Sequence, residues 1–422
     1  MKTEFFKSDI LNSGYSVTEL PCGLKVYICE KNEFNSVYAA FGTKYGSIDS
    51  SFTVNGKQVS VPDGIAHFLE HKLFESEDGD AFSKYSATGA YANAFTSFDR
   101  TCYIFSCTDR FYENLDILLG FVQNPYFTPE TVKKEQGIIG QEIKMYDDSP
   151  NWNVLFGMLE AMYHNNPVKI DIAGTVESIA MIDDKVLYEC YNTFYNPSNM
   201  FICIAGNVDT EEVLKRIKDS IKPSAKIDLK RGEFSEPKSV VNSYVEKSLE
   251  VSMPLFCYGY KQDVSSGDPT FKEMLAVNAF VKLLADNASP LYKRLIDKKL
   301  INDEFDAEYF NGRYFASVIF EGESADPKAV VQEINAEIDE IRKNGIDMNL
   351  FEAVKRDMYG QAVKRYNSVD AVALMLVDSA VFGYNYSKEL ETIKNLSEAD
   401  LMAVLPIFDK DRAVLSVINR RV

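Results

Sequence analysis

The chain has 422 residues, more than one hydrophobic core usually supports, so we expect two or more domains. With 46% hydrophobic and 26% charged residues, the composition is that of a folded protein and excludes a disordered one. The formal net charge of −18 argues against binding to nucleic acids or anionic membrane surfaces, because both would repel an acidic surface. No run approaches the roughly 20 apolar residues of a membrane span.

The seven cysteines predict a reducing compartment. They are odd in number, show no Cys-x-x-Cys spacing, and several lie in apolar runs such as residues 200–206. Such cysteines are typical of buried free thiols. The N-terminus has neither the apolar core nor the cleavage site of a signal peptide, so we expect a cytoplasmic protein.

The first predicted elements are two strands within residues 20–45, where β-branched and aromatic residues are interrupted by Gly and Asn. Apolar residues at helical spacing follow a Pro-Asp-Gly start and predict a helix over residues 65–73. A second pair of strands is expected within residues 87–99 and 101–108.

Helices and one buried strand follow. Residues 128–147 are predicted to be helical, with Thr128 as the cap and Pro129 in the first turn. The other predicted helices of this half are 111–123, 151–163 and 183–194, and the strand is 199–208.

The later part of the chain repeats the first in outline. Residues 221–245 are polar and without apolar periodicity, and we interpret them as a linker between domains at 1–220 and 246–422. After the linker, GQAVKRY at 360–366 matches GQEIKMY at 140–146. This favours an internal duplication over chance similarity, with Ala362 opposite Glu142. The second half has no histidine, so it cannot repeat an imidazole site.

Two of the chain's three histidines stand four apart in HFLEH at 67–71. On a helix, His67 and His71 share one face and can both bind one ion, at about 2.0–2.1 Å for zinc. Glu70 shares enough of that face to reach a water on the ion, as in the inverzincin motif His-x-x-Glu-His. The third histidine, His164, is assigned to a loop hydrogen bond.

A catalytic zinc usually has three protein ligands and one open position, so a third donor is needed. Glu135 and Glu142 are two turns apart on the predicted helix 128–147. Either could bind the metal while the other hydrogen-bonds a ligand from behind. Zinc would polarise a water, Glu70 would accept its proton, and the chemistry would be amide hydrolysis.

The chain resembles the pitrilysin/insulinase-type zinc peptidases, of the half-length class that includes mitochondrial processing peptidase. Five segments carry this resemblance, in the order found in the family: GIAHFLEHKLFE (64–75), GAYANAFTSFDRTCY (89–103), KKEQGIIGQEI (133–143), NPVKIDIAGTVESI (166–179) and FYNPSNMFICIAGNVD (194–209). The second half matches the family only in general pattern.

The resemblance implies roles for the site residues. His67, His71 and Glu142 would bind Zn²⁺, Glu70 would be the general base, and Glu135 the supporting carboxylate. The substrate peptide would be added as an extra strand to an edge strand that contains Asn93, Ala94, Phe95 and Thr96.

The resemblance also implies an α+β fold of two similar domains, each a mostly antiparallel sheet flanked by helices. Two chains would close as a clamshell around peptides or unfolded segments. One departure bears on activity: Ile296 stands where the family typically has a substrate-binding arginine, Arg294 is out of register by two, and no tyrosine follows at the right spacing. We therefore expect a second similar chain, either a zinc-less partner that supplies the arginine and tyrosine or another copy of this chain.

Two alternatives to the peptidase hypothesis are a non-catalytic peptide-binding or scaffold subunit and a purely structural zinc site. Scaffold relatives usually lose a histidine or glutamate of the motif, and here every one is present. A structural zinc prefers four protein ligands and needs no glutamate base. The complete motif and the presence of Glu70 therefore favour a peptidase over a scaffold and over a structural zinc site.

Overall fold

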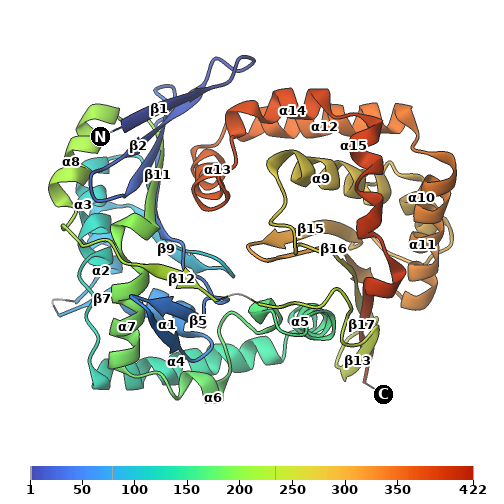
Figure 1. The fold of residues 1–422 in the computed structure, drawn as a ribbon, viewed down its shortest axis with the longest axis horizontal. Helices are drawn as coiled ribbons and strands as arrows, with labels where there is room; N and C mark the ends of the chain where they lie inside the picture. The colour runs from blue at the N-terminus through green and yellow to red at the C-terminus, as the bar shows by residue number, and fades with distance from the viewer. Residues whose placement is uncertain (1, 78, 233, 422) are drawn as a thin grey trace. The chain divides into compact units, whose positions relative to one another are not determined.

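The computed structural model describes residues 2–77, 79–232 and 234–421. The chain forms two compact units, each assembled from three segments. Unit 1 comprises Met1–Ile143, Asp171–Glu233 and Ala362–Glu389, and unit 2 comprises Lys144–Ile170, Phe234–Gln361 and Leu390–Val422. Each unit is a mostly antiparallel sheet flanked by helices, which confirms the predicted α+β class (Figure 1). The division of the chain at residues 221–245 stays a prediction.

The main sheet of unit 1 has seven strands in the order β1-β2-β3-β11-β4-β10-β9. The β3–β11 pair is parallel and the other pairs are antiparallel. Every residue of β4 and β11 is buried, because helices cover both faces of the sheet. The strands are β1 Lys2–Lys7, β2 Gly14–Glu19, β3 Lys25–Glu30, β4 Val37–Thr43, β9 Tyr91–Thr96, β10 Thr101–Cys107 and β11 Met200–Gly206.

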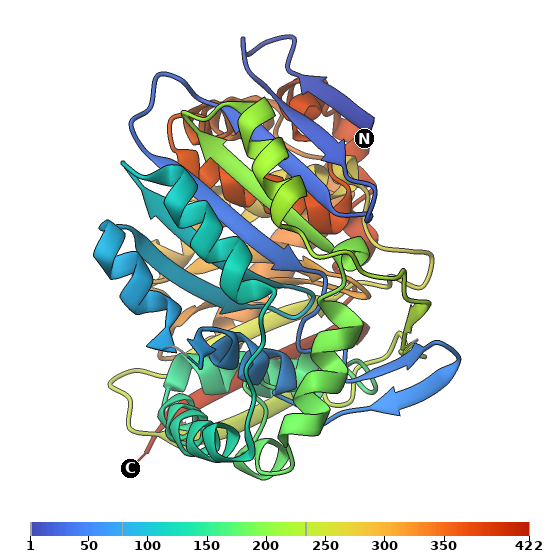
Figure 2. The same cartoon turned by 90° about the vertical axis from the view of Figure 1, so that its left-hand side faces the viewer.

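Helices α1, α3 and α8 lie against one face of this sheet, as Figure 2 shows for α3 and α8. The helices of unit 1 from the first half of the chain are α1 Ile65–Leu73, α2 Ala81–Thr88, α3 Phe111–Val122, α4 Pro129–Asp147 (up to Ile143), α6 Val176–Ile179, α7 Asp184–Phe194 and α8 Thr210–Ser220. The predicted helices of this half agree with the structure to within one or two residues at each end.

The sequence prediction missed the first two strands and the small sheets. A three-stranded sheet, β12-β5-β6, consists of β5 Ser51–Val54, β6 Lys57–Ser60 and β12 Leu229–Arg231. A two-stranded sheet pairs β7 Glu75–Ser76 with β8 Gly79–Asp80. The strands of the small sheets have two to four residues each, and β1 is largely exposed, so these elements lack the apolar alternation by which strands are predicted.

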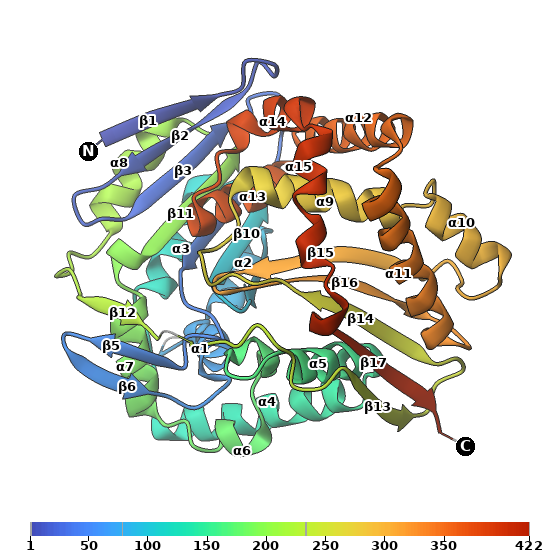
Figure 3. The same cartoon turned by 45° about the vertical axis from the view of Figure 1, so that its right-hand side comes forward.

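The sheet of unit 2 has five strands in the order β13-β17-β14-β16-β15, with helices packed against it (Figure 3). Its strands are β13 Tyr244–Leu249, β14 Leu255–Lys261, β15 Asp306–Gly312, β16 Phe315–Glu323 and β17 Ala413–Arg420. Its helices from the second half of the chain are α9 Phe271–Ala285, α10 Pro290–Asp297, α11 Pro327–Asn344, α12 Met348–Arg365 (up to Gln361), α14 Glu389–Asn395 and α15 Glu398–Met402. No described helix has the length and apolar content needed to cross a membrane.

The two units repeat one topology. Strands β3, β4, β9, β10 and β11 have the same chain order, sheet order and directions as β13, β14, β15, β16 and β17. The corresponding helices include α1 and α9, α4 and α12, and α7 and α15. This order supports the predicted duplication, and Ala362 is a buried residue of α12, where it offers no carboxylate.

The repeat includes an exchange of helices between the halves of the chain. Helix α5 (Pro150–Met162) packs on β14 and β17 of unit 2, although it precedes the predicted linker. Helix α13 (Val369–Phe382) packs on β4 and β11 of unit 1, although it follows that linker. A sequence pattern cannot predict which sheet an apolar helix will cover.

An ion pair anchors α13 to unit 1. The Arg100 guanidinium lies 3.1 Å from an Asp378 carboxylate oxygen and 5.4 Å from the centre of the Phe382 ring. Arg100 belongs to the β9–β10 turn, where its carbonyl accepts a hydrogen bond from the Ser97 amide. This contact therefore joins the second half of the chain to the turn that follows the predicted substrate strand.

We expect Asp378→Ala to lower the free energy of unfolding by about 1–3 kcal/mol, because it removes the nearer of the two carboxylates that pair with the largely buried guanidinium of Arg100 and leaves Asp99 at 3.6 Å. Urea unfolding followed by circular dichroism measures the change. Leu374→Ala, at a side chain of α13 that is 39% exposed, is the control and should have a smaller effect. Equal losses in both variants would contradict this role of the ion pair.

Candidate metal centre

Helix α1 is held at its start by a close backbone contact. Gly64 has φ of 87°, and a Cβ there would lie 2.3 Å from the Ala173 carbonyl oxygen. Gly174 has φ of 75°, and a Cβ there would lie 2.5 Å from the Asp63 carbonyl oxygen, which also accepts a hydrogen bond of 2.8 Å from Ser178 Oγ. Only glycine fits such positions without strain. The segment 171–178 thus fixes the position at which helix α1 begins.

The apolar residues of α1 then orient its histidines. Ile65, Phe68, Leu69 and Leu73 are buried in the core of unit 1. The opposite face carries His67 and His71, whose ring centroids are 4.6 Å apart. The two imidazoles share one face, as the four-residue spacing predicts.

Helix α4 brings a carboxylate to the two histidines. Glu142 lies 3.8 Å from His67 Nε2 through one carboxylate oxygen and 3.6 Å from His71 Nε2 through the other. One ligand atom from each of the three residues lies within 4.8 Å of the others, and no second such group of His, Cys, Asp and Glu occurs among the described residues. Donors about 2.1 Å from a tetrahedral zinc would be roughly 3.4 Å apart, so small shifts would complete this arrangement.

Glu135, also on α4, occupies the other side of the His71 ring. Its carboxylate lies 3.0 Å from His71 Nδ1 and is buried. A carboxylate at Nδ1 favours the tautomer with the proton on that atom, which leaves Nε2 available as a metal ligand. Glu142 thus lies beside the Nε2 atoms of both histidines, and Glu135 lies at Nδ1 of His71, as the predicted roles of ligand and supporting carboxylate require.

The two histidines differ in their environment. Burial, together with the nearby His71, lowers the pKa of His67 to about 3, so its ring stays neutral, as a metal ligand requires. Burial also lowers the pKa of His71, but the hydrogen bond to Glu135 and the surrounding carboxylates outweigh it, and the net pKa is raised. His67 Nδ1 is buried without a hydrogen-bond partner in the described chain.

Glu70 lies beside the donors, with a contact that the sequence did not indicate. Thr96 Oγ donates a hydrogen bond of 2.8 Å to the Glu70 carboxylate. Burial raises the pKa of Glu70, and this hydrogen bond opposes the rise. Thr96 ends strand β9, so the predicted substrate strand also orients the predicted base.

The other predicted site residues are spread along β9. Asn93, Ala94 and Phe95 lie in this strand, which is an edge of the seven-stranded sheet and, among the described strands, pairs only with β10. The Ala94 amide donates to the side-chain oxygen of Asn93 at 2.9 Å. His164, as expected, lies in a loop, where its ring is 3.4 Å from Ser239 Oγ.

Comparisons with known proteins identify the family. Residues 60–176 match the model of insulinase, peptidase family M16, and residues 182–358 match that of the peptidase M16 inactive domain. The chain is 40% identical over 391 residues to an uncharacterized zinc protease, YmfH, of Bacillus subtilis, with 91% of each protein covered.

The chain belongs to the M16 peptidase family. Its fold resembles that of an M16-like peptidase from Alicyclobacillus acidocaldarius, with a TM-score of 0.93, 30% identity and coverage of 97% of this chain and 99% of the other. A protease from Helicobacter pylori shares the fold at a TM-score of 0.84 and 21% identity, over 96% and 99% of the two chains. The five predicted metal-centre residues all fall within the M16 insulinase match; they are His67, Glu70, His71, Glu135 and Glu142.

If Glu135 orients His71, Glu135→Gln should weaken zinc binding about 10- to 100-fold, because the neutral amide holds the Nδ1 proton less strongly. Competition with a chromophoric chelator measures the affinity. Glu130→Gln, in the first turn of the same helix, is the matched control and should leave affinity unchanged. Equal affinities of the Glu135→Gln variant and the unmodified chain would refute this supporting role.

Proposed function

We propose that the chain is the catalytic subunit of a zinc-dependent endopeptidase or oligopeptidase that hydrolyses peptides or unfolded segments. The observation that carries this proposal is the convergence of His67, His71 and Glu142 with Glu70 beside them. Three donors suit a catalytic zinc, which keeps one position open.

The chain's own residues would perform the proton transfers. A bound zinc ion would supply a Lewis acid that acidifies a water molecule and polarises the scissile carbonyl. Thr96 holds one oxygen of Glu70, and the other oxygen can accept the proton of the attacking water. A raised pKa makes the Glu70 carboxylate a stronger base and suits it to return the proton to the leaving amine.

The substrate would bind as an added strand on β9. Edge strands offer unpaired backbone groups to an extended peptide. Because the Ala94 amide bonds the Asn93 side chain, peptide binding at that position would exchange an internal hydrogen bond for an intermolecular one.

The rival function is that of a non-catalytic scaffold, which the match to the M16 inactive domain favours. That match covers residues 182–358 and contains none of the five metal-centre residues. The presence of Glu70 supports catalysis, because neither a scaffold nor a structural zinc site needs this base.

Two substitutions separate these functions. Glu70→Gln should retain zinc but reduce peptide cleavage by at least about 100-fold, because the amide cannot accept a proton. His71→Ala should lose zinc as well as activity, because two donors remain. Elemental analysis and a fluorogenic peptide assay measure the two properties. Full turnover by the Glu70→Gln variant would exclude this mechanism.

We further propose a second similar chain, in a cytoplasmic clamshell enclosing the substrate. Ile296, at the expected arginine position, is a 39% exposed apolar residue of α10. The nearby Arg294 is engaged by Glu333 and Glu337, at 3.1 and 2.7 Å. These contacts support a need for an arginine and a tyrosine from a zinc-less partner, with a homodimer as the alternative. The seven free cysteines are consistent with a reducing compartment.

The purified chain alone should therefore cleave peptides at least about 10-fold more slowly than its complex with the partner, because it lacks the positioning arginine. The complex can be isolated by affinity purification from the source cells, and its kcat/KM compared with that of the chain alone. Comparable values would refute the need for a different partner and leave the homodimer.

A further inference from the structure

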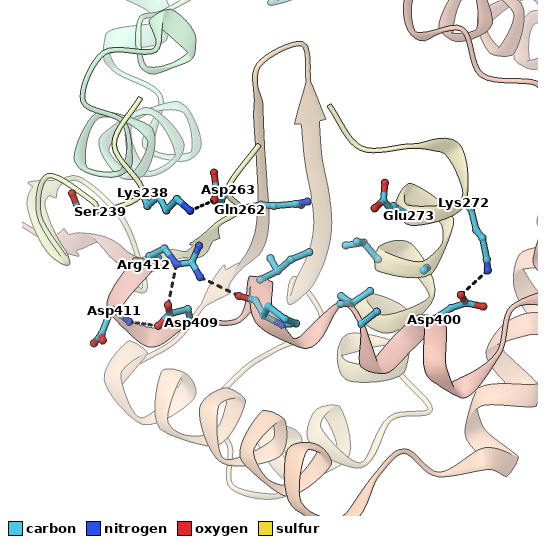
Figure 4. A pocket seen from close by; sticks show the side chains of 16 residues that line it. Lys238, Ser239, Gln262, Asp263, Lys272, Glu273, Asp400, Asp409, Asp411 and Arg412 are labelled. Atoms are coloured by element: carbon cyan, nitrogen blue, oxygen red, sulfur yellow. Dashed lines mark hydrogen bonds and ion pairs between the residues drawn. The ribbon is translucent and has the colours of Figure 1, made fainter. Parts of the chain in front are cut away.

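Unit 2 contains a cavity of about 870 Å³ between α9 and the segment 398–412 (Figure 4). This volume lies in the range of about 300–1,000 Å³ found for ligand sites. Apolar residues from both sides line the cavity, and four of them are buried. These apolar residues are Ala276, Val277, Ala403, Val404, Pro406 and Ile407.

The charged residues of the cavity leave an excess of negative charge. Its three cations are paired: Lys238 with Asp263 at 2.6 Å, Lys272 with Asp400 at 2.6 Å and Arg412 with Asp409 at 2.9 Å. Two further lining acids, Glu273 and Asp411, take part in no ion pair of the described chain. The electrostatic field of the cavity therefore favours a cationic ligand.

The topological repeat shows what fills the corresponding space in unit 1. There the connection from β4 to α1 contains the β5–β6 hairpin. Tyr45 of this connection stacks on Phe194 of α7 at 3.9 Å between ring centroids, and Phe52 meets the same ring edge-on at 4.7 Å. Both aromatic side chains are fully buried.

In unit 2 the corresponding connection, residues 262–270, has no hairpin and no aromatic residue. The elements around it correspond: α9 to α1, and the segment 398–412 to α7 and the turn after it. The N-caps support this correspondence. Asn196 caps the short turn that precedes β11, and Asp409 caps the short turn that precedes β17. The cavity thus occupies the position that an extended aromatic segment fills in unit 1.

We propose that this cavity binds an extended peptide segment with an aromatic side chain beside basic residues. The aromatic ring would lie against the apolar lining residues of α9 and the segment 398–412, and the basic groups would face Glu273 and Asp411. This inference goes beyond the proposed function, because no residue of the cavity belongs to the metal centre.

The test is peptide binding by the full chain, carrying Glu70→Gln and freed of metal so that no cleavage occurs. The probe is a fluorescein-labelled Lys-Phe-Thr-Val-Lys amide, which copies the Phe-Thr-Val of β5, and its affinity is measured by fluorescence anisotropy. The matched probe, with Glu in place of both Lys, should bind at least 10-fold more weakly.

Substitutions locate the binding. Val277→Trp, at a buried residue of α9, should fill the cavity and weaken binding of the basic probe at least 10-fold. Val241→Trp, the same change at a residue that is 44% exposed, should leave binding unchanged. Asp411→Lys, on the exposed rim, should weaken binding several-fold and tests the cavity even if Val277→Trp does not fold.

Two results would overturn the proposal: equal binding of the two probes, or full binding of the basic probe to folded Val277→Trp or Asp411→Lys variants. Peptide binding in the cavity is measured without cleavage. Absence of peptide hydrolysis would therefore contradict the proposed peptidase function and not the proposed binding in the cavity.

Discussion

The candidate metal centre depends on one contact, in which helices α1 and α4 meet and bring several charged side chains together. Helices α1 and α4 bring two imidazoles and the carboxylates of Glu70, Glu135 and Glu142 together, and Glu70 and Glu135 are buried. Burying several carboxylates near one another is unfavourable unless a cation balances them. A divalent ion held by His67, His71 and Glu142 would provide this charge. The same ion would give the buried Glu70 its role as a base.

The surrounding fold holds these groups in position from three directions. The glycine contact at Gly64 and Gly174 fixes the start of α1, and the core residues of α1 fix its rotation. The end of β9 holds Glu70 through Thr96. Helix α13, from the far half of the chain, holds the turn after β9 through the ion pair of Asp378 with Arg100. A helix from the second half of the chain therefore holds the turn next to the strand residue that binds Glu70.

The local parts of this site could be predicted from the sequence. Histidines four apart on an apolar helix must share a face, and the helix containing Glu135 and Glu142 has clear capping and periodicity. The residues alone did not decide which glutamate binds the metal, because both face the same way. The structure separates their positions: the two residues are about 10.5 Å apart along the axis of α4, and the His71 ring lies between their carboxylates, with Nδ1 toward Glu135 and Nε2 toward Glu142.

Other features depend on tertiary contacts that no local pattern encodes. The hydrogen bond from Thr96 to Glu70 joins residues on a strand and a helix, and the exchange of α5 and α13 requires knowing which sheet each helix covers. The β5–β6 hairpin was missed because its strands are short, yet it fills in unit 1 the space that remains open in unit 2.

The most direct test of the metal centre is a crystal structure of the zinc-loaded chain with anomalous data at the zinc absorption edge. The account predicts a single strong peak about 2.0–2.2 Å from Nε2 of His67, Nε2 of His71 and a carboxylate oxygen of Glu142, with Glu135 still bound to Nδ1 of His71. A zinc peak elsewhere, or one that Glu142 does not contact, would contradict it.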